Sequence, residues 1–388
     1  MNPNHFDVIV VGAGVAGSAA AYQLAATQKV LVLEQFPFLH KLGSSHGGSR
    51  IFRHAYGDAR YVALAVAADE LWQRLEHDTD EKLLTRTGGL DIGREGYPAL
   101  TEVERALKKA GRPVETLSPS DVEKRFPAFR LPAGNVALYQ PDAGILAATR
   151  CVNALLRGAA AGGAVLHDDE PVTTFNVSPD RVDVVTARGS YSADKLIITA
   201  GPWLSEGLSE GLGELTTGLA PALHVEQQQV IYLKVAQAEK FAPSRMPIFI
   251  NHDPQAEVYG FPLFDLPHAI KISDHANAPT VTLRERKTEL MEARALETVR
   301  RAQSFLPGVT NDIVHFEMCL YTKTPDEHFI LDLHPEHDNV VIGGGFSGHG
   351  FKFGPVLGEI LADLALAGSS RHDLSLFASS RFAAQAAG

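Results

Sequence analysis

The sequence predicts an α/β protein in which a domain with a parallel sheet is interleaved with a second domain rich in antiparallel strands. Three observations indicate this fold. An apolar strand, a glycine turn and an alanine-rich helix follow one another at residues 6–27, strands and a second alanine-rich helix recur at residues 145–199, and strand-rich segments separate and follow these parts. With 388 residues, 45% of them hydrophobic, the chain is long enough for two domains or three.

The first unit has the pattern of a dinucleotide-binding βαβ motif. Residues 6–11 (FDVIVV) predict a buried strand, residues 18–27 a helix, and residues 29–33 (KVLVL) a second buried strand that ends at Glu34. The turn between the first strand and the helix reads GAGVAG at residues 12–17. The same six letters fit a plain glycine turn, but the strand, the helix and the acid around them favour a dinucleotide site.

Each glycine of this turn has a mechanical role. Gly12 permits the tight turn, Gly14 lets backbone N–H groups approach a pyrophosphate, and Gly17 lets the helix pack closely on the strand. The helix N-terminus offers partial positive charge to the phosphates. Glu34 can accept hydrogen bonds from an adenosine ribose and would repel a 2′-phosphate, which favours FAD or NAD over NADP.

The remaining elements follow from local patterns. Strand-rich segments are predicted at residues 84–92, 225–235 and 248–272, strands at residues 164–166, 172–177, 182–187, 195–199 and 339–342, and helices at residues 145–162, 284–305 and 355–367. The charged helix at residues 284–305 is expected to place Leu290, Ala293 and Leu296 on one face. We expect one domain to contain residues 1–84, 146–220 and 325–388, and the other residues 85–145 and 221–324.

A second glycine turn (GGGFSG) occupies residues 343–348. The chain ends too soon after the following helix to complete another βαβ unit with a ribose-binding acid, so we do not expect a second nucleotide here. The turn, with Gly345 and Gly348, is instead expected beside the reactive ring of the first dinucleotide. The N-terminus of the helix that begins near Pro355 could stabilise negative charge on that ring.

Composition excludes several classes of protein. The formal net charge is −11, so a nucleic-acid partner or a basic membrane-binding surface is not expected. Cys151 and Cys319 are too few and too far apart for a disulfide framework or a cysteine-rich metal site, and no metal is expected. Apolar runs are too short to span a bilayer, and the first strand leaves no room for a cleavable leader. These features favour a cytoplasmic enzyme.

A basic loop follows the first unit. Residues 44–56 (SSHGGSRIFRHAY) contain His46, Arg50, Arg53 and His54. Such a cluster is often a solvated loop. Its closeness in sequence to the dinucleotide unit favours a role in the site.

Several motifs together resemble the monomeric sarcosine oxidase family of flavoenzymes, which includes N-methyltryptophan oxidases. They are SSHGGSRIFRHAYG, YGFP, the spacing of Lys271 and His275, CLYTKTPDEHFILDLHPEH and GFSGHGFKF, and the resemblance covers essentially the whole chain. It implies a glutathione-reductase-like, Rossmann-type FAD-binding domain with an interleaved mixed or antiparallel-sheet substrate domain. It further implies FAD bound covalently through a cysteine thioether, oxidation of a secondary amine, oxygen as acceptor, and a monomer.

The same resemblance implies roles for individual residues. Cys319 stands where the flavin-linking cysteine is found, although a lone cysteine in an apolar stretch is by itself more often inert. Arg53 and Lys352 match the pair that holds the substrate carboxylate. Lys271 matches the lysine near the flavin N5 that activates oxygen electrostatically.

Four further residues complete the predicted site. Arg50 and His46 would flank the flavin ring, with Arg50 offsetting the charge of the reduced ring, and Tyr259 and His275 would line the substrate cavity. Two features depart from the family pattern. The segment from Tyr259 to Lys271 is a residue longer than expected, and residues 47–49 (GGS) are less polar.

The activity implied is that of a sarcosine oxidase, which converts sarcosine, O2 and water to glycine, formaldehyde and H2O2. N-methyl-L-tryptophan and pipecolate are alternative substrates. An amine dehydrogenase with a different electron acceptor, or a flavin-holding sensor without turnover, remain alternative functions.

Overall fold

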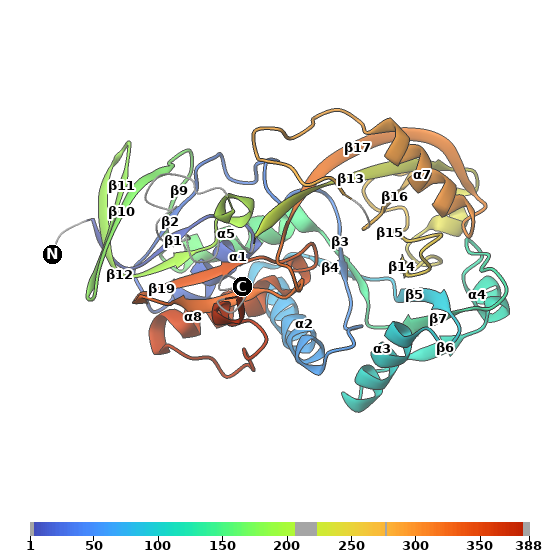
Figure 1. Cartoon of the computed structure of the whole chain (residues 1–388), viewed down its shortest axis with the longest axis horizontal. Helices are drawn as coiled ribbons and strands as arrows, with labels where there is room; N and C mark the ends of the chain where they lie inside the picture. The colour runs from blue at the N-terminus through green and yellow to red at the C-terminus, as the bar shows by residue number, and fades with distance from the viewer. Residues whose placement is uncertain (1–3, 206–222, 276–277, 383–388) are drawn as a thin grey trace.

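The computed structural model describes residues 4–205, 223–275 and 278–382. Within these ranges the strands form two large sheets and a small third one between them (Figure 1). The predicted domain boundary between residues 220 and 221 lies outside the described residues. The other domain boundaries stay a prediction.

The first sheet has a parallel centre. Strand β1 (His5–Val11) lies between β12 (Gly189–Ile198) and β2 (Val30–Leu33) and runs parallel to both. The sheet is completed by β9 (Val165–His167), β10 (Val172–Ser178), β11 (Arg181–Thr186), β18 (Ile330–His334) and β19 (His337–Gly344). Early and late parts of the chain therefore meet in one sheet.

Strand β1 is apolar on both faces because both faces are covered. Val8 and Val10 pack among helical residues, whereas Ile9 and Val11 pack against the side that carries β10 and β11. The four side chains are 0–4% exposed. A continuous apolar run is what a parallel strand covered on two sides requires.

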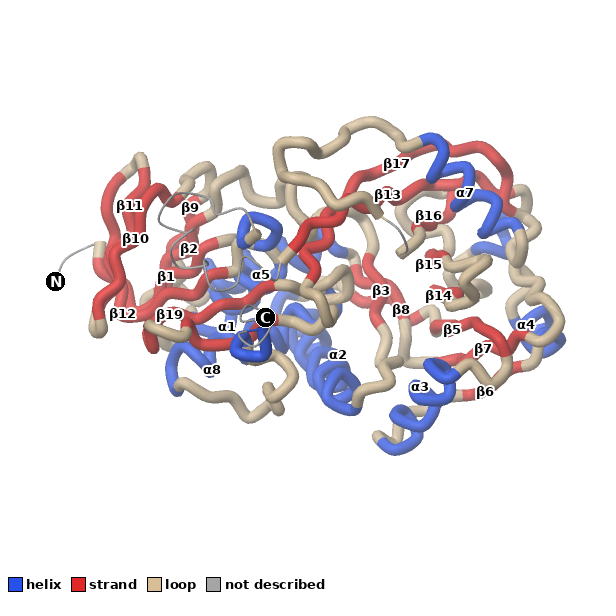
Figure 2. The backbone as a smooth tube through the Cα atoms, viewed as in Figure 1, coloured by secondary structure: helices blue, strands red, loops and turns tan. Residues whose placement is uncertain are grey.

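Helix α1 (Val15–Leu24) is rich in small residues because it is enclosed by other helices. It packs against α5 (Ala148–Ala161) and α8 (Gly354–Ala367). A Cβ atom on Gly358 would lie 2.4 Å from the backbone carbon of Ala19, so a larger residue there would push the two helices apart. Figure 2 shows α1, α5 and α8 grouped with α2 (Ala59–Thr79) beside the first sheet.

The second sheet is mostly antiparallel. It contains, in spatial order, β17 (Val309–Lys323), β13 (His224–Val235), β16 (Ala269–Ser273), β15 (Val258–Gly260), β14 (Ile248–Asn251), β5 (Gly89–Arg94), β7 (Asn135–Gln140) and β6 (Glu115–Leu117). The pair β5 and β14 is parallel, which makes the sheet mixed. The small sheet contains β3 (Arg50–Phe52), β8 (Gly144–Leu146) and β4 (Leu84–Arg86).

Alternation along β16 separates core from cavity. Ile270 and Ile272 join the apolar cluster that also contains residues of α7 (Glu292–Gln303). Lys271 and Ser273 point to the opposite face, since successive side chains of a strand alternate. Figure 1 shows α7, α3 (Pro98–Lys109) and α4 (Pro119–Arg125) at the end of the molecule away from the first sheet.

Two of the strand-rich segments predicted from the sequence contain several strands. Residues 84–92 contain β4 and the start of β5, which are separate because Gly88 has a φ of +72° and both Thr87 and Gly88 donate to the carbonyl of Ala143. Residues 248–272 contain β14, β15 and most of β16.

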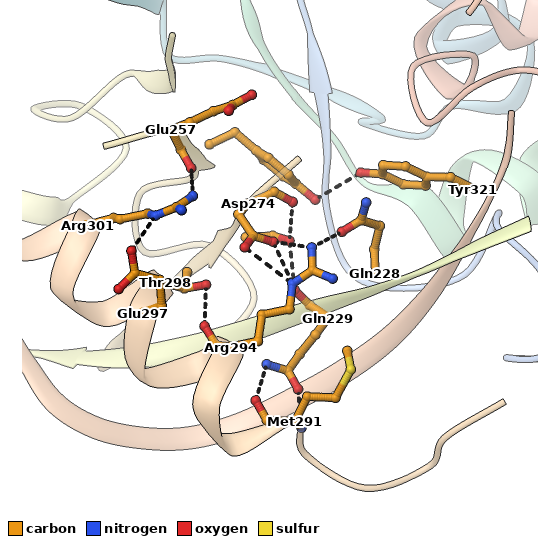
Figure 3. Close-up of polar contacts among 12 residues, drawn as sticks. Gln228, Gln229, Glu257, Asp274, Met291, Arg294, Glu297, Thr298, Arg301 and Tyr321 are labelled. Atoms are coloured by element: carbon orange, nitrogen blue, oxygen red, sulfur yellow. Dashed lines mark hydrogen bonds and ion pairs between the residues drawn. The ribbon is translucent and has the colours of Figure 1, made fainter. Parts of the chain in front are cut away.

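The charged helix was predicted to begin at residue 284 but begins at residue 292. Side chains of β13 bind the preceding backbone. Gln227 accepts from the N–H of Lys287 and donates to its carbonyl. Gln229 accepts from the N–H of Met291 at 2.5 Å (Figure 3). These hydrogen bonds use backbone groups of Lys287 and Met291 that would otherwise take part in a helix. The predicted apolar face was also wrong, because Leu296 is 63% exposed and Ala295, Val299 and Ala302 are buried instead.

No helix among the described residues is long and apolar enough to cross a membrane.

Candidate functional site

A large cavity lies between the two main sheets and contains nearly every predicted site residue. Its volume is about 1960 Å³ when the open mouth is included. The predicted residues that line it are Gly12, Gly14, Glu34, His46, Arg50, Arg53, Tyr259, Lys271, His275, Cys319, Gly345, Gly348 and Lys352. Gly17 lies behind the wall. The arrangement brings these residues together, and their roles stay predictions.

One end of the cavity is formed by the first glycine turn. Gly12 has a φ of +97°, which favours glycine. A Cβ atom on Gly17 would lie 1.9 Å from the carbonyl oxygen of Gly12, so only glycine lets α1 begin here. Ser45 accepts a hydrogen bond from the N–H of Val15 at 3.0 Å, which places the start of the basic loop against the helix N-terminus.

Glu34 is fixed at the end of β2. Its carboxylate accepts from the N–H of Ala13 at 2.8 Å and from the N–H of Phe36 at 3.2 Å. The imidazole of His40 lies 3.5 Å away. The acid is therefore held at the carboxyl edge of the parallel sheet, beside the glycine turn, where a ribose hydroxyl could reach it.

The basic loop wraps around the guanidinium of Arg50. The two terminal nitrogens of this group donate to the carbonyls of Ser49, Ser44 and His46 at 2.9, 3.2 and 2.6 Å. Arg50 also lies 3.9 Å from the sulfur of Cys319. The loop thus presents a fixed positive charge to the wall that carries the predicted flavin-linking cysteine.

Strand β17 places three side chains on the face that meets Arg50. Glu317, Cys319 and Tyr321 alternate along the strand. Glu317 accepts from the hydroxyl of Tyr232 at 3.3 Å, and the hydroxyls of Tyr321 and Tyr259 lie 3.4 Å apart. Cys319 is thus a cavity residue. Cys151, by contrast, is buried in α5, where burial raises the pKa of its thiol, as expected of an inert core cysteine.

His46 faces the cavity with its polar atoms unused. Neither ring nitrogen has a hydrogen-bond partner among the described residues, although the side chain is buried. Burial, followed by the charge of Arg50, lowers the pKa of His46 to about 4. A buried imidazole without partners is costly unless a ligand supplies them.

Lys271 is the most enclosed cation of the cavity. Its side chain is 3% exposed, and its ammonium donates to the carbonyl oxygen of Ser49 at 2.9 Å and to the hydroxyl of Ser49 at 3.2 Å. Burial and the charge of Arg50 lower the pKa of Lys271 to about 8, although Asp265 and Glu317 act to raise it. Lys271 therefore titrates close to neutral pH.

Arg53 and Lys352 both contact Tyr56. The guanidinium of Arg53 is 4.9 Å from the centre of the Tyr56 ring, and Lys352 donates to the Tyr56 hydroxyl at 2.8 Å. Burial, and then the charge of Arg53, lower the pKa of Lys352 well below its ordinary value. Asp91 lies 3.4 Å from Arg53 and supplies one negative charge to the group.

Aromatic side chains line the wall between these cations. The rings of Tyr259 and His275 lie 4.5 Å apart, and those of His275 and Tyr321 lie 6.0 Å apart. Burial, and then the charge of Arg53, lower the pKa of His275 to about 3, so the ring is neutral. Next to His275, Asp274 forms an ion pair with Arg294 at 2.5 Å, which attaches α7 to the end of β16 (Figure 3).

The second glycine turn closes the cavity. Gly345 and Gly348 have φ values of +60° and +78°. A Cβ atom on Gly348 would lie 2.4 Å from the ring of Tyr321, so glycine allows the turn to approach this tyrosine. Lys352 follows in the 3₁₀ turn Phe351–Phe353, and α8 begins after it with Pro355 in its first turn.

Four residues that contact the site, Ser45, Tyr56, Asp265 and Tyr321, were not predicted from the sequence. Tyr321 could have been found from strand periodicity, because it lies two residues after Cys319. Ser45 and Tyr56 lie within the basic loop that was singled out. Asp265 carries no local signal, since its role depends on how a loop folds against Lys271.

The cavity fits a long dinucleotide with a ring system at one end. The glycine turn and Glu34 suit the phosphates and the ribose, and the other end carries Cys319, Arg50, Lys271 and the unsatisfied ring of His46. FAD is a dinucleotide of this shape, with a negatively charged pyrophosphate in its middle and its reactive ring at one end.

Comparison with protein families agrees with this chemistry. The family described as FAD dependent oxidoreductase matches residues 7–364. Monomeric sarcosine oxidase of Bacillus sp. (strain B-0618) is 40% identical over 382 residues, which cover 97% of this chain and 96% of the relative. Peroxisomal sarcosine oxidase of Homo sapiens is 35% identical over 389 residues, with 97% and 96% covered.

N-methyl-L-tryptophan oxidase of Yersinia pestis (strain Pestoides F) is 34% identical and covers 97% of this chain and 99% of its own. Among solved structures, NikD, an unusual amino acid oxidase essential for nikkomycin biosynthesis, superposes with a TM-score of 0.84 at 27% identity, with 97% of each chain covered.

The buried imidazole of His46 predicts acid sensitivity. Its pKa is about 4 in the folded chain against an ordinary 6.5, so the unfolded chain binds the proton more tightly. The contribution of the neutral His46 ring to the free energy of unfolding is complete above about pH 6.5. It is lost as the pH falls toward 4, on the order of 1 kcal/mol per pH unit. In urea unfolding at several pH values, His46→Gln should show a shallower loss of unfolding free energy in this window.

His315→Gln serves as the control because the His315 side chain is 52% exposed. It should keep the slope of the parent protein. Equal slopes for His46→Gln and the parent would contradict the assignment.

Proposed function

The chain belongs to the FAD dependent oxidoreductase family, and from this premise we propose that it is a sarcosine oxidase. The observation that carries the proposal is a single cavity that joins a dinucleotide cradle to a thiol, a buried lysine and an arginine–lysine pair. The proposed reaction converts sarcosine, O2 and water to glycine, formaldehyde and H2O2. Sarcosine loses a hydride and a proton to become an imine, which water hydrolyses, and O2 receives the two electrons and two protons.

We propose that FAD is held at both ends of the cavity. Gly12, Gly14 and Glu34 would bind its phosphates and ribose, and Cys319 would form a thioether to its ring. The position of the Cys319 sulfur, 3.9 Å from Arg50 and on the cavity wall, supports this attachment. When bound, FAD accepts the hydride and returns the electrons to oxygen.

Arg53 and Lys352 would bind the substrate carboxylate. Asp91, 3.4 Å from Arg53, offsets part of the positive charge of the pair. A bound carboxylate would favour the charged form of Lys352, whose pKa is lowered by burial and by the charge of Arg53. The guanidinium would bind the carboxylate through two parallel hydrogen bonds, and the ammonium would add a point charge.

The neutral rings around the cations would position the amine. Tyr259, His275 and Tyr321 form an apolar wall with polar tips. Because the pKa of His275 is lowered to about 3, the ring adds no positive charge near the substrate nitrogen. Such a wall could also accept a larger N-methyl amino acid, so N-methyl-L-tryptophan and pipecolate remain alternatives.

Lys271 and Arg50 would supply fixed positive charge for the electron transfers. Lys271 would stabilise negative charge as electrons pass to oxygen, an electrostatic effect that needs no proton transfer by the side chain. Arg50 would offset the charge of the reduced ring, and His46 would bind the ring with its unused nitrogens.

We further propose that the enzyme is a monomer of the cytoplasm. The bacterial relatives carry the word monomeric in their names, and the two cysteines are free.

A panel of amines tests the activity. Sarcosine should release peroxide continuously, faster than N-methyl-L-tryptophan or pipecolate, as followed with a peroxidase-coupled dye. Parallel assays under nitrogen with an artificial electron acceptor identify a dehydrogenase. Turnover that needs the artificial acceptor would contradict the oxidase, and absence of turnover with every amine would leave a flavin-holding protein.

The carboxylate pair gives a second prediction. Arg53→Ala should lower kcat/KM for sarcosine by roughly 10- to 100-fold, because a charged hydrogen-bonded partner is lost. It should lower kcat/KM for an N-methylamine without a carboxylate much less. Arg86→Ala is the matched control, since Arg86 pairs with Asp69 and does not line the cavity. Equal losses for both substrates would refute the pairing.

A further inference from the structure

The loop between β15 and β16 places a carboxylate beside Lys271. Asp265 lies 3.7 Å from the ammonium of Lys271, and its side chain is 9% exposed. One carboxylate oxygen accepts from the hydroxyl of Ser49 at 2.7 Å and from that of Tyr232 at 3.0 Å. The other oxygen is buried and has no hydrogen-bond partner among the described residues.

Gly48 leaves the space that the carboxylate of Asp265 occupies. A Cβ atom on Gly48 would lie 2.2 Å from the partnerless oxygen. Asp265 belongs to the segment from Tyr259 to Lys271 and Gly48 to residues 47–49, the two stretches predicted to depart from the family pattern. The loop before β16 supplies the acid, and the absence of a side chain at Gly48 leaves space for it.

The charges that face Lys271 come from every element packed against it. The basic loop supplies His46 and Arg50, and β13 supplies the hydroxyl of Tyr232. The loop before β16 supplies Asp265, and β17 supplies Glu317 and Cys319. Of these groups, Arg50 favours the neutral amine and the two carboxylates favour the ammonium. Asp265 forms a direct ion pair with it.

We propose that Asp265 is a positioning residue that keeps Lys271 protonated and directed into the cavity. This inference rests on the proposed function of Lys271 in oxygen activation. Ser49 connects the two groups, because its carbonyl and hydroxyl accept from Lys271 while the hydroxyl donates to Asp265. Asp265 does not line the cavity and would act through Lys271.

Removal of the carboxylate should move the titration of Lys271. With Asp265 present the pKa of Lys271 is about 8, so most of the side chain is charged below that pH. An opposite charge at this distance typically shifts a pKa by roughly 1–3 units. Asp265→Asn keeps the shape and the acceptor for Ser49, and should therefore lower the pH at which Lys271 loses its proton by about that amount.

The test uses FAD-loaded full-length protein with lysine labelled at Cε with carbon-13. The Lys271 resonance is assigned by its absence in Lys271→Met and is followed against pH in the parent and in Asp265→Asn. Reoxidation of the reduced enzyme by oxygen is measured over the same pH range. We expect the midpoints of both curves to move down together, while anaerobic reduction by the amine keeps its rate.

Asp69→Asn is the control, because the Asp69 side chain is also 9% exposed and pairs with a different cation, Arg86. It should leave the Lys271 midpoint in place. Asp265→Ser removes the charge without crowding Gly48 and replaces Asp265→Asn if that variant does not fold.

An unchanged titration of Lys271 in the charge-removing variant would overturn the inference. Failure of the proposed function has a different signature. If no amine yields peroxide, or if Lys271→Met leaves reoxidation intact, the oxidase role of Lys271 fails while its titration still reports on Asp265.

Discussion

The site depends on positive charge held at the junction of two sheets. Lys271 and Lys352 are buried, and Arg50 and Arg53 are partly buried beside them. Cations without compensation are costly in such a place. Loop carbonyls surround Arg50, Asp265 pairs with Lys271, and Asp91 pairs with Arg53. The protein balances these charges in part, and the remainder suits an anionic cofactor and a substrate carboxylate.

The two sheets contribute different groups to the cavity. The first sheet supplies a cradle through backbone geometry, since Gly12, Gly17 and the end of β2 fix where a dinucleotide can lie. The second sheet supplies side chains, because alternation on β16 and β17 directs Lys271 and Cys319 to the same cavity. The basic loop with β3 lies between them. A chain that passes repeatedly between the two sheets can place both kinds of group within one cavity.

The sequence predicted those parts of the fold that depend on residues close together in the chain. The unit from β1 to Glu34 was predicted because a buried run, a glycine turn and an alanine-rich helix are each legible in sequence. Helix α2 was missed although Asp58 caps it and buried residues such as Tyr61, Leu64 and Trp72 recur with helical spacing. The start of α7 could not be predicted, because glutamines of β13, some sixty residues earlier, bind the backbone before it. The role of Asp265 could not be predicted for the same reason, because the loop brings this residue beside Lys271 only in the folded chain.

The attachment of the cofactor to Cys319 is the central claim and can be measured directly. The protein is precipitated in acid, digested with trypsin, and analysed by mass spectrometry for the peptide of residues 302–323, which contains Cys319. The account predicts a yellow precipitate and a peptide heavier by one FAD less two hydrogen atoms, while the peptide of residues 151–157, which contains Cys151, is unmodified. A colourless precipitate with both peptides at their unmodified masses would contradict it.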